Sequence, residues 1–164
     1  MKKLLVLIAS ALLLTACSNT AEEGAELYGT TAGGWNDVVD ITNLSATELT
    51  RKMQKTGADV VYFGFNESSL NSQAKADLQK QADWLNENPR ALIVIEGRCD
   101  ERGTREYNLA LGEQRANAAR SYLIAKGISP DRIRTISFGK DKPVVLGSDE
   151  ESWAKNRSAT TVAY

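Results

Sequence analysis

Apolar residues recur with a helical period in two segments of the chain and in short strand-like runs in four others. Ala74, Leu78, Ala82 and Leu85 fall on one face of a helix. Residues 91–97 are almost continuously apolar, which is typical of a strand covered on both faces. From these patterns we expect strands at residues 60–63, 91–97, 133–138 and 158–164, and helices at about 72–88 and 105–125.

Polar and small residues at the ends of these segments support the boundaries. Asn71 or Ser72 can cap the first helix, and Thr104 the second, because their side chains accept hydrogen bonds from free backbone N–H groups. Pro89 stops the first helix, since the residue before a proline avoids helical geometry. Gly127 ends the second helix.

The order of these elements, β-α-β-α-β-β, predicts an α/β (α+β) sandwich in which two helices pack on one face of a sheet. Residues 139–149 are expected to form a loop before the last strand. Upstream, Ser45 and Glu48 have the spacing of a capping box, which predicts a short helix that ends near Gly57. The regular pattern defines one domain at residues 59–164.

The first residues have the pattern of a secretion signal. Lys2 and Lys3 precede an apolar run at residues 4–14, which is shorter than the roughly 20 residues needed to cross a bilayer. The run continues into Leu14-Thr15-Ala16-Cys17, which resembles a bacterial lipobox. A lipobox implies cleavage before Cys17 and attachment of lipid chains, such as palmitate, to that cysteine. The alternative is an ordinary signal peptide with a cysteine near its end by chance.

The segment between this signal and the domain consists mainly of small, polar and acidic residues. We interpret residues 18–44 as a flexible tether, because they contain too few large apolar side chains to form a core. The chain then divides into a signal peptide (1–16), a lipidated tether with the short helix (17–58) and the domain (59–164). Trp35 in the tether either docks on the domain or contacts a partner.

Composition excludes several classes of function. The net charge of −1 offers no electrostatic footprint for nucleic acid. The chain contains no histidine, which excludes catalytic triads that depend on it and removes the commonest ligand of catalytic zinc. Of the two cysteines, lipidation of Cys17 leaves Cys99 without a disulfide partner. We expect Cys99 to be a small core residue at the end of a strand.

Charged and polar side chains cluster between the second strand and the second helix. Asn108 and Arg115 are seven residues apart, so they share a helix face to within about 20°. Asp100 precedes that helix at the carboxyl end of a strand, where ligands often bind in α/β folds. A carboxylate and a guanidinium together suit a zwitterion, because Asp100 can pair with an ammonium and Arg115 with a carboxylate. The alternative is an internal salt bridge between Asp100 and Arg115.

A longer motif surrounds these residues. It reads Gly97-x-x-Asp100-x-x-Gly103 and then Asn108-x-x-Leu111-x-x-x-Arg115-Ala116, and it closely resembles the OmpA-like peptidoglycan-binding domain. The resemblance extends over about residues 60–164 and includes Val61-Tyr62-Phe63, the loop at 138–143 and Asn156-Arg157. Together with the lipobox and the tether, the whole chain resembles the peptidoglycan-associated lipoprotein (Pal) family of Gram-negative outer membranes.

The resemblance implies a four-stranded mixed sheet and a defined ligand, the meso-diaminopimelate of the peptidoglycan stem. Asp100 would pair with its ammonium and Arg115 with its carboxylate, and Asn108 would contact the ligand beside them. Asn66 stands where the family supplies contacts from the first loop. Arg157 is a weaker candidate from the last strand. For Asn66 and Arg157, turn capping and surface charge are the alternatives.

Three positions depart from the family pattern. The first loop reads Phe63-Gly64-Phe65-Asn66 and lacks the usual carboxylates, which puts an acidic contribution from this loop in doubt. Arg98 stands where histidine is common, and it is an extra cation that could bind stem carboxylates or partly neutralise Asp100. Gly112 replaces a common serine and lowers the helix propensity.

The implied function is anchoring, with no enzymatic activity and no cofactor. The protein would hold the outer membrane to peptidoglycan through lipid on Cys17, with its domain facing the periplasm. Ser18 after the lipidated cysteine favours sorting to the outer membrane. Membership of the Tol-Pal system would add Tol proteins, notably TolB, as partners and a role in cell division.

Two alternatives stay open at this point. The first is an OmpA-like wall-binding lipoprotein outside the Tol system. The second is a peptidoglycan hydrolase, for which paired carboxylates are available at Glu96, Asp100, Glu101 and Glu106. Basic residues beside these carboxylates favour the ionised form of all four, which argues against a hydrolase.

Overall fold

A computed structural model describes residues 45–164 of the chain. The predicted signal peptide, the predicted lipidation site Cys17, the predicted tether and Trp35 lie outside these residues. They therefore remain predictions from the sequence.

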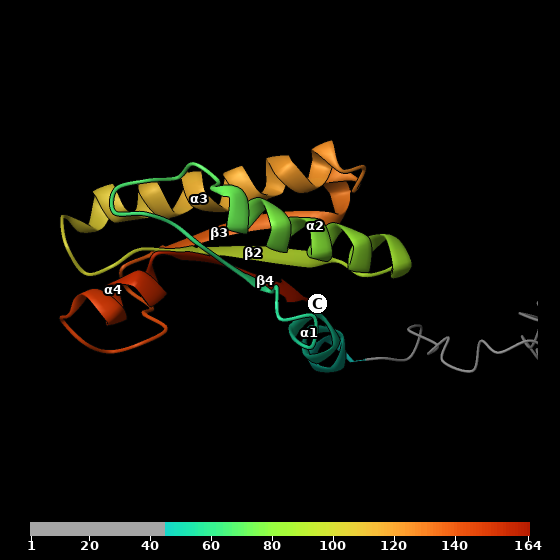
Figure 1. The fold of residues 1–164 in the computed structure, drawn as a ribbon, viewed down its shortest axis with the longest axis horizontal. Coiled ribbons are helices and arrows are strands. Elements are labelled where there is room, and N and C mark those ends of the chain that lie inside the picture. The colour runs from blue at the N-terminus through green and yellow to red at the C-terminus, as the bar shows by residue number, and fades with distance from the viewer. Residues whose placement is uncertain (1–44) are drawn as a thin grey trace, which may run out of the picture. The chain divides into compact units, whose positions relative to one another are not determined.

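The described residues form one four-stranded sheet with helices on both sides (Figure 1). The strand order is β1-β4-β2-β3; β2 and β3 are parallel, whereas β4 runs antiparallel to both β1 and β2. Helices α2 and α3 cover one face, and α1 and α4 lie on the other side (Figure 1). The strands are β1 (Val60–Tyr62), β2 (Ile93–Arg98), β3 (Ile133–Gly139) and β4 (Ser158–Ala163), and the helices are α1 (Ala46–Gln54), α2 (Ser72–Glu87), α3 (Arg105–Ala125) and α4 (Glu150–Asn156), with a 3₁₀ turn η2 (Pro130–Arg132) before β3.

This architecture confirms the predicted fold class and most of the predicted helix ends. Ser45 forms both hydrogen bonds of the capping box at the start of α1. The cap of α2 is Asn71 rather than Ser72, and Thr104 caps α3 as predicted. Gly127 follows α3 with a φ of 94°, in the left-handed region that glycine adopts without strain.

Helix α4 is absent from the predicted element order. It occupies Glu150–Asn156, between the predicted loop and the last strand, and Asp149 caps it by accepting a hydrogen bond from the Ser152 amide at 2.9 Å. Seven residues make only two turns, too few to establish a helical period of apolar residues. Strand β2 also begins two residues later than predicted, at Ile93.

Two glycines bring α3 unusually close to β2. A Cβ atom on Gly97 would lie 1.8 Å from the carbonyl oxygen of Gly112, so only glycine fits at position 97. A Cβ atom on Gly112 would lie 2.4 Å from the hydroxyl of Ser137. The propensity cost predicted for Gly112 is therefore offset by close packing, which sets the first half of α3 against the end of β2.

Within residues 45–164, no helix combines the length and the hydropathy needed to cross a bilayer.

Candidate functional site

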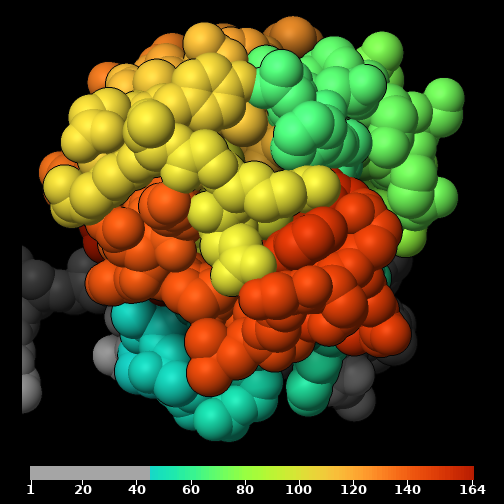
Figure 2. Space-filling view, turned by 90° about the vertical axis from the view of Figure 1, so that its left-hand side faces the viewer, coloured from blue at the N-terminus to red at the C-terminus, as the bar shows by residue number. Residues whose placement is uncertain are grey.

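A pocket of about 260 Å³ opens where the loops after β1 and β2 meet the first half of α3. Figure 2 looks onto this end of the molecule, where chain near residue 65 (green), near residues 100–110 (yellow) and near residues 140–157 (orange to red) come together. The lining contains four of the five predicted ligand-binding residues. The full set is Phe65, Asn66, Cys99, Asp100, Arg102, Gly103, Tyr107, Asn108, Leu111 and Arg115.

Arg115 is the most completely buried charged side chain of the pocket, with 1% of its surface exposed. Its guanidinium donates to three backbone carbonyls: Nε to Glu67 at 2.8 Å, Nη1 to Arg98 at 2.9 Å and Nη2 to Gly64 at 3.1 Å. Burial lowers the pKa of Arg115, but a guanidinium stays charged at any physiological pH.

Three of the five N–H groups of Arg115 are used in this way. Each terminal nitrogen makes one hydrogen bond to oxygen within the part of the chain that the structure describes, so one N–H on each is left for the weaker Cys99 thiol or for a ligand. A carboxylate accepts from two such N–H groups of one guanidinium. Arg115 therefore ties the loop after β1 to the end of β2, and it retains donors for an anion in the pocket.

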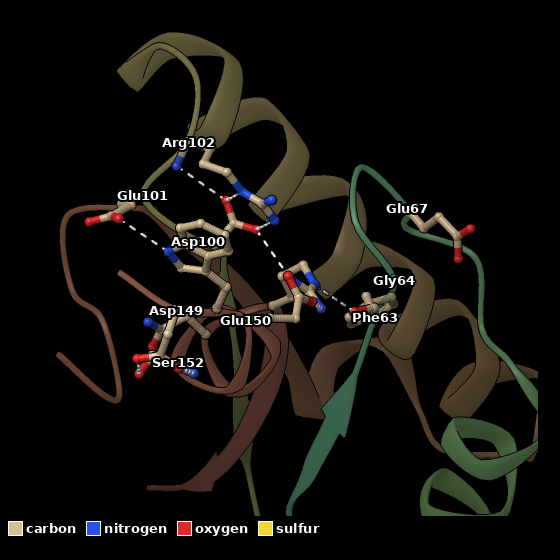
Figure 3. A network of polar contacts seen from close by, with 12 residues as sticks. Phe63, Gly64, Glu67, Asp100, Glu101, Arg102, Asp149, Glu150 and Ser152 are labelled. Carbon is tan, nitrogen blue, oxygen red and sulfur yellow. Dashed lines mark hydrogen bonds and ion pairs between the residues drawn. The ribbon is translucent and has the colours of Figure 1, made fainter. Parts of the chain in front are cut away.

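Asp100 is 5% exposed and pairs with two cations, of which Figure 3 labels Arg102. Its carboxylate accepts from the backbone amide of Arg102 at 3.1 Å, from Nε of Arg102 at 3.1 Å and from Nη2 at 2.6 Å. Nη1 of Arg157 adds a contact at 3.5 Å. Burial alone raises the pKa of Asp100, but the hydrogen bonds from Arg102 and Arg157 outweigh it and hold the pKa below its ordinary value.

Asp100 and Arg115 are thus brought into one pocket without forming an ion pair with each other. The cations that pair with Asp100 are Arg102 and Arg157. The alternative of an internal Asp100–Arg115 salt bridge is therefore wrong for this structure. The two opposite charges that a zwitterion would need stay separate within the pocket.

The two asparagines of the predicted site shape the pocket wall. Asn108 is 2% exposed, and its side-chain amide donates to the carbonyls of Arg102 at 2.7 Å and Thr104 at 3.0 Å, which fixes the turn before α3. Asn66 has a φ of 58°, a left-handed conformation that asparagine tolerates, and its side-chain oxygen accepts from the hydroxyl of Tyr107.

Arg157 lies behind the pocket rather than in its lining. It follows α4 and is 6% exposed. Its Nε donates to the carbonyl of Phe63 at 3.1 Å, and its Nη2 pairs with Glu150 at 2.7 Å. Its third contact is with Asp100, so Arg157 connects the pocket to the end of α4.

Arg102 is a pocket residue that the sequence reasoning missed. Its guanidinium carbon lies 4.1 Å from the ring centres of both Phe65 and Trp153, while its nitrogens pair with Asp100. Trp153 belongs to α4, so this arrangement could not be recognised without that helix. The nearest signal in the sequence was the position of Arg102 two residues after Asp100.

Arg98 and Cys99, which flank the end of β2, differ in how they relate to the site. The side chain of Arg98 does not lie beside Asp100, because Asp100 lies beyond the end of β2 and Arg98 bonds Glu96 at 2.5 Å and Thr160 at 3.1 Å, outside the pocket lining. The expectation of an extra cation in the site is therefore wrong. Cys99 is a buried free thiol at the end of β2, as expected, and burial raises its pKa.

The carboxylates proposed for a hydrolase do not form a catalytic pair. Glu96 bonds Arg98, Asp100 bonds Arg102, and the side chain of Glu101 accepts from Nε1 of Trp153 at 3.1 Å. Among residues 45–164 there is also no cluster of three side chains suited to hold a metal ion.

Comparisons with known proteins agree with this architecture. The model of the OmpA family matches residues 62–157. A peptidoglycan-associated lipoprotein of Mesorhizobium japonicum is 48% identical over 103 residues, which cover 63% of this chain and 61% of that protein, so the match spans less than two thirds of its length. One of Pasteurella multocida is 37% identical over 162 residues, 99% of this chain and 97% of that protein.

A solved structure shows the same fold. The peptidoglycan-associated lipoprotein from Burkholderia pseudomallei is 47% identical and superposes with a TM-score of 0.63. The match covers 65% of this chain and 90% of that structure.

Proposed function

The chain belongs to the OmpA family, with peptidoglycan-associated lipoproteins among its relatives, and on this basis we propose that it binds peptidoglycan non-covalently. The observation that carries the proposal is the pocket, in which a buried carboxylate and a buried guanidinium lie unpaired with each other. Buried charges are costly, and Asp100 and Arg115 together provide complementary partners for a zwitterion.

We propose that this zwitterion is the side-chain end of meso-diaminopimelate in the peptide stem. Asp100 would accept from its ammonium, and the two remaining N–H groups of Arg115 would hold its carboxylate. Asn108 and Asn66 line the same pocket and would contact the ligand beside these charges. A volume of about 260 Å³ suits one side-chain end better than a disaccharide, since sites for whole small molecules start at ~300 Å³.

The proposed anchor at the other end is Cys17. A signal peptide at residues 1–16 and lipid on Cys17 would hold the protein in the outer membrane, with the domain in the periplasm. Each buried methylene group contributes about 0.8 kcal/mol, so several acyl chains make a durable anchor. Many copies that each bind one stem weakly would together hold the membrane firmly to the wall.

The proposal extends to the Tol-Pal system, with TolB as a partner and a role in cell division. This extension rests on the resemblance of the motif, lipobox and tether to the Pal family, since the relatives are named only as peptidoglycan-associated lipoproteins. A pull-down with TolB tests it: retention of TolB is expected. The alternative, a wall-binding lipoprotein outside the Tol system, is favoured if TolB is not retained while a peptidoglycan-associated lipoprotein used as positive control retains it.

A hydrolytic role has little support, because the relatives are named as lipoproteins that associate with peptidoglycan rather than as enzymes. Incubation of the protein with purified sacculi should release no soluble muropeptides. Their release would overturn a function limited to binding.

Co-sedimentation with purified sacculi tests the proposed function. We expect the wild type to pellet with sacculi and Asp100→Ala to stay in the supernatant, because the ammonium loses its partner. Asp141→Ala is the matched control, since Asp141 is an exposed carboxylate that pairs with Arg105 outside the pocket. If folded Asp100→Ala pellets as the wild type does, Asp100 does not bind the wall.

A further inference from the structure

The Asp100 carboxylate has no free position for an incoming ammonium. An ionised carboxylate offers about four lone-pair positions on its two oxygens. Oδ1 accepts from the backbone amide and Nε of Arg102, and Oδ2 accepts from Nη2 of Arg102 and Nη1 of Arg157. Any ammonium that pairs closely with Asp100 must therefore displace one of these donors.

The two cations that hold Asp100 differ in how firmly they are held. The side chain of Arg157 is 8% exposed, and it is also bound by the Phe63 carbonyl and by Glu150. The side chain of Arg102 is 33% exposed, and within the described residues it hydrogen-bonds only to Asp100. Its remaining contacts are with the rings of Phe65, which is itself 62% exposed, and Trp153. Arg102 is therefore the donor that can leave.

We propose that Arg102 closes the site in the free protein by standing in for the ammonium of the ligand on Asp100, and that the ligand must displace it to bind. This inference rests on the proposed function, because it assumes that Asp100 receives an ammonium. The guanidinium meets both oxygens of Asp100, at 3.1 Å through Nε and at 2.6 Å through Nη2. A cation exchanges for a cation, so Asp100 stays paired throughout.

The exchange gives the site a form of selectivity. A neutral group in the pocket would take the place of Arg102 and leave Asp100 with only the 3.5 Å contact of Arg157, and a buried charge that is so weakly paired is costly. An ammonium replaces the lost partner and removes that cost. Arg102 thus excludes groups without positive charge, and it lowers the apparent affinity even for the correct ligand.

Substitution of Arg102 separates this role from that of an ordinary ligand contact. When only a fraction of the protein is competent to bind, the apparent dissociation constant rises by the inverse of that fraction. If about a tenth of the molecules have Arg102 displaced, Arg102→Ala tightens binding by about tenfold. Arg102→Lys keeps a cation that reaches Asp100 but lacks the planar fork of a guanidinium. Its affinity for the ligand should lie between those of Arg102→Ala and the wild type.

The test is calorimetric titration of the full chain with a soluble muropeptide that carries an L-Ala-D-Glu-meso-diaminopimelate stem. Arg105→Ala is the control, because it removes a neighbouring cation that pairs with Asp141 and does not line the pocket. We expect tighter binding for Arg102→Ala and unchanged binding for Arg105→Ala. In the NMR spectrum of the wild type, the Nε–H signal of Arg102 should shift when the muropeptide is added.

The outcomes distinguish this inference from the proposed function. Weaker binding by folded Arg102→Ala, with wild-type binding intact, would make Arg102 a ligand contact and overturn the inference alone. Equal tightening by Arg105→Ala would assign the effect to net charge and also overturn it. A wild type that binds no muropeptide would overturn the proposed function, and the inference with it.

Discussion

Two arginines reach the same pocket and are held there in opposite ways. Arg115 is 1% exposed and is bound by three backbone carbonyls, two from the loop after β1 and one from the end of β2. The side chain of Arg102 is a third exposed, and it is held by one carboxylate and two aromatic rings. Backbone carbonyls cannot leave without unfolding the loops, whereas Asp100 can take another cation in place of Arg102.

One pocket can therefore contain both an arginine that stabilises the fold and an arginine that a ligand can replace. Arg115 is part of the scaffold and offers a fixed positive charge to an anion. Arg102 is a replaceable occupant of the site for a cation. The anionic end of a zwitterion would therefore meet a preformed partner, Arg115. The cationic end would have to compete with Arg102 for Asp100.

The largest effect is expected for Arg115→Ala on stability. The substitution leaves three carbonyls without their donor and opens a cavity, so we expect the free energy of unfolding to fall by about 3–5 kcal/mol. Arg115→Lys keeps the charge but cannot reach all three carbonyls, so its free energy of unfolding should fall by less than that of Arg115→Ala. Urea denaturation measures both variants. An Arg115→Ala protein as stable as the wild type would show that the carbonyl contacts are not structural.

Asp100→Asn should have the next largest effect, on binding. It keeps the shape of the side chain and removes its charge, so a charge-assisted bond of about 1.5–3 kcal/mol is lost. This corresponds to a roughly 10- to 100-fold weaker affinity for the diaminopimelate muropeptide in calorimetry. Asp141→Asn is the control outside the pocket. Equal affinities of Asp100→Asn and the wild type would remove Asp100 from the site.

The dependence of stability on pH should also identify Asp100. Its pKa is lower in the folded protein than in the unfolded chain, so its ionised form stabilises the fold at pH values above the ordinary aspartate pKa of about 3.9. That stabilisation is lost as the pH falls through the folded pKa. We therefore expect the stability advantage of the wild type over Asp100→Asn, measured by urea denaturation, to shrink below about pH 4.

Asp149 also has a lowered pKa, with hydrogen bonds from the Ser152 amide and hydroxyl as the main cause, but it is present in both proteins. The difference between them therefore reports on Asp100. A difference that stays constant between pH 7 and pH 2 would contradict the assigned ion pairs.

The smallest effect is expected for Arg102→Ala on stability. In the free variant Arg157 still pairs with Asp100 and water can enter the space that Arg102 leaves. An ion pair whose arginine is a third exposed contributes about 1 kcal/mol or less, so thermal and urea unfolding should change little. The contrast with Arg115→Ala is the essential result. A loss as large as that of Arg115→Ala would mean that Arg102 is also part of the scaffold.

Much of the fold could be predicted because its signals are local. The caps at Ser45, Asn71 or Ser72 and Thr104 follow from the preference of helix starts for side-chain acceptors. The helical spacing of Asn108 and Arg115 put them on one face of α3, and the structure brings both into the pocket.

The rest depends on contacts between distant segments, which spacing along the chain does not encode. Helix α4 is too short for a period to appear, and with it the contact of Trp153 with Arg102 was missed. The carbonyl partners of Arg115 come from the loop after β1 and from the end of β2, and the approach of these two segments is fixed only by the complete fold. The pairing of Asp100 with Arg102 likewise depends on how one turn is folded.

The most direct test of the central claim is to compare two muropeptides that differ only in the third residue of the stem. One carries meso-diaminopimelate, and the other carries L-lysine, which keeps the ammonium and lacks the carboxylate. If the pocket grips both charges of a zwitterion, the wild type should bind the diaminopimelate muropeptide roughly tenfold or more tightly than the lysine muropeptide in calorimetry. Equal affinities would show that Arg115 holds no carboxylate and would contradict the proposed recognition.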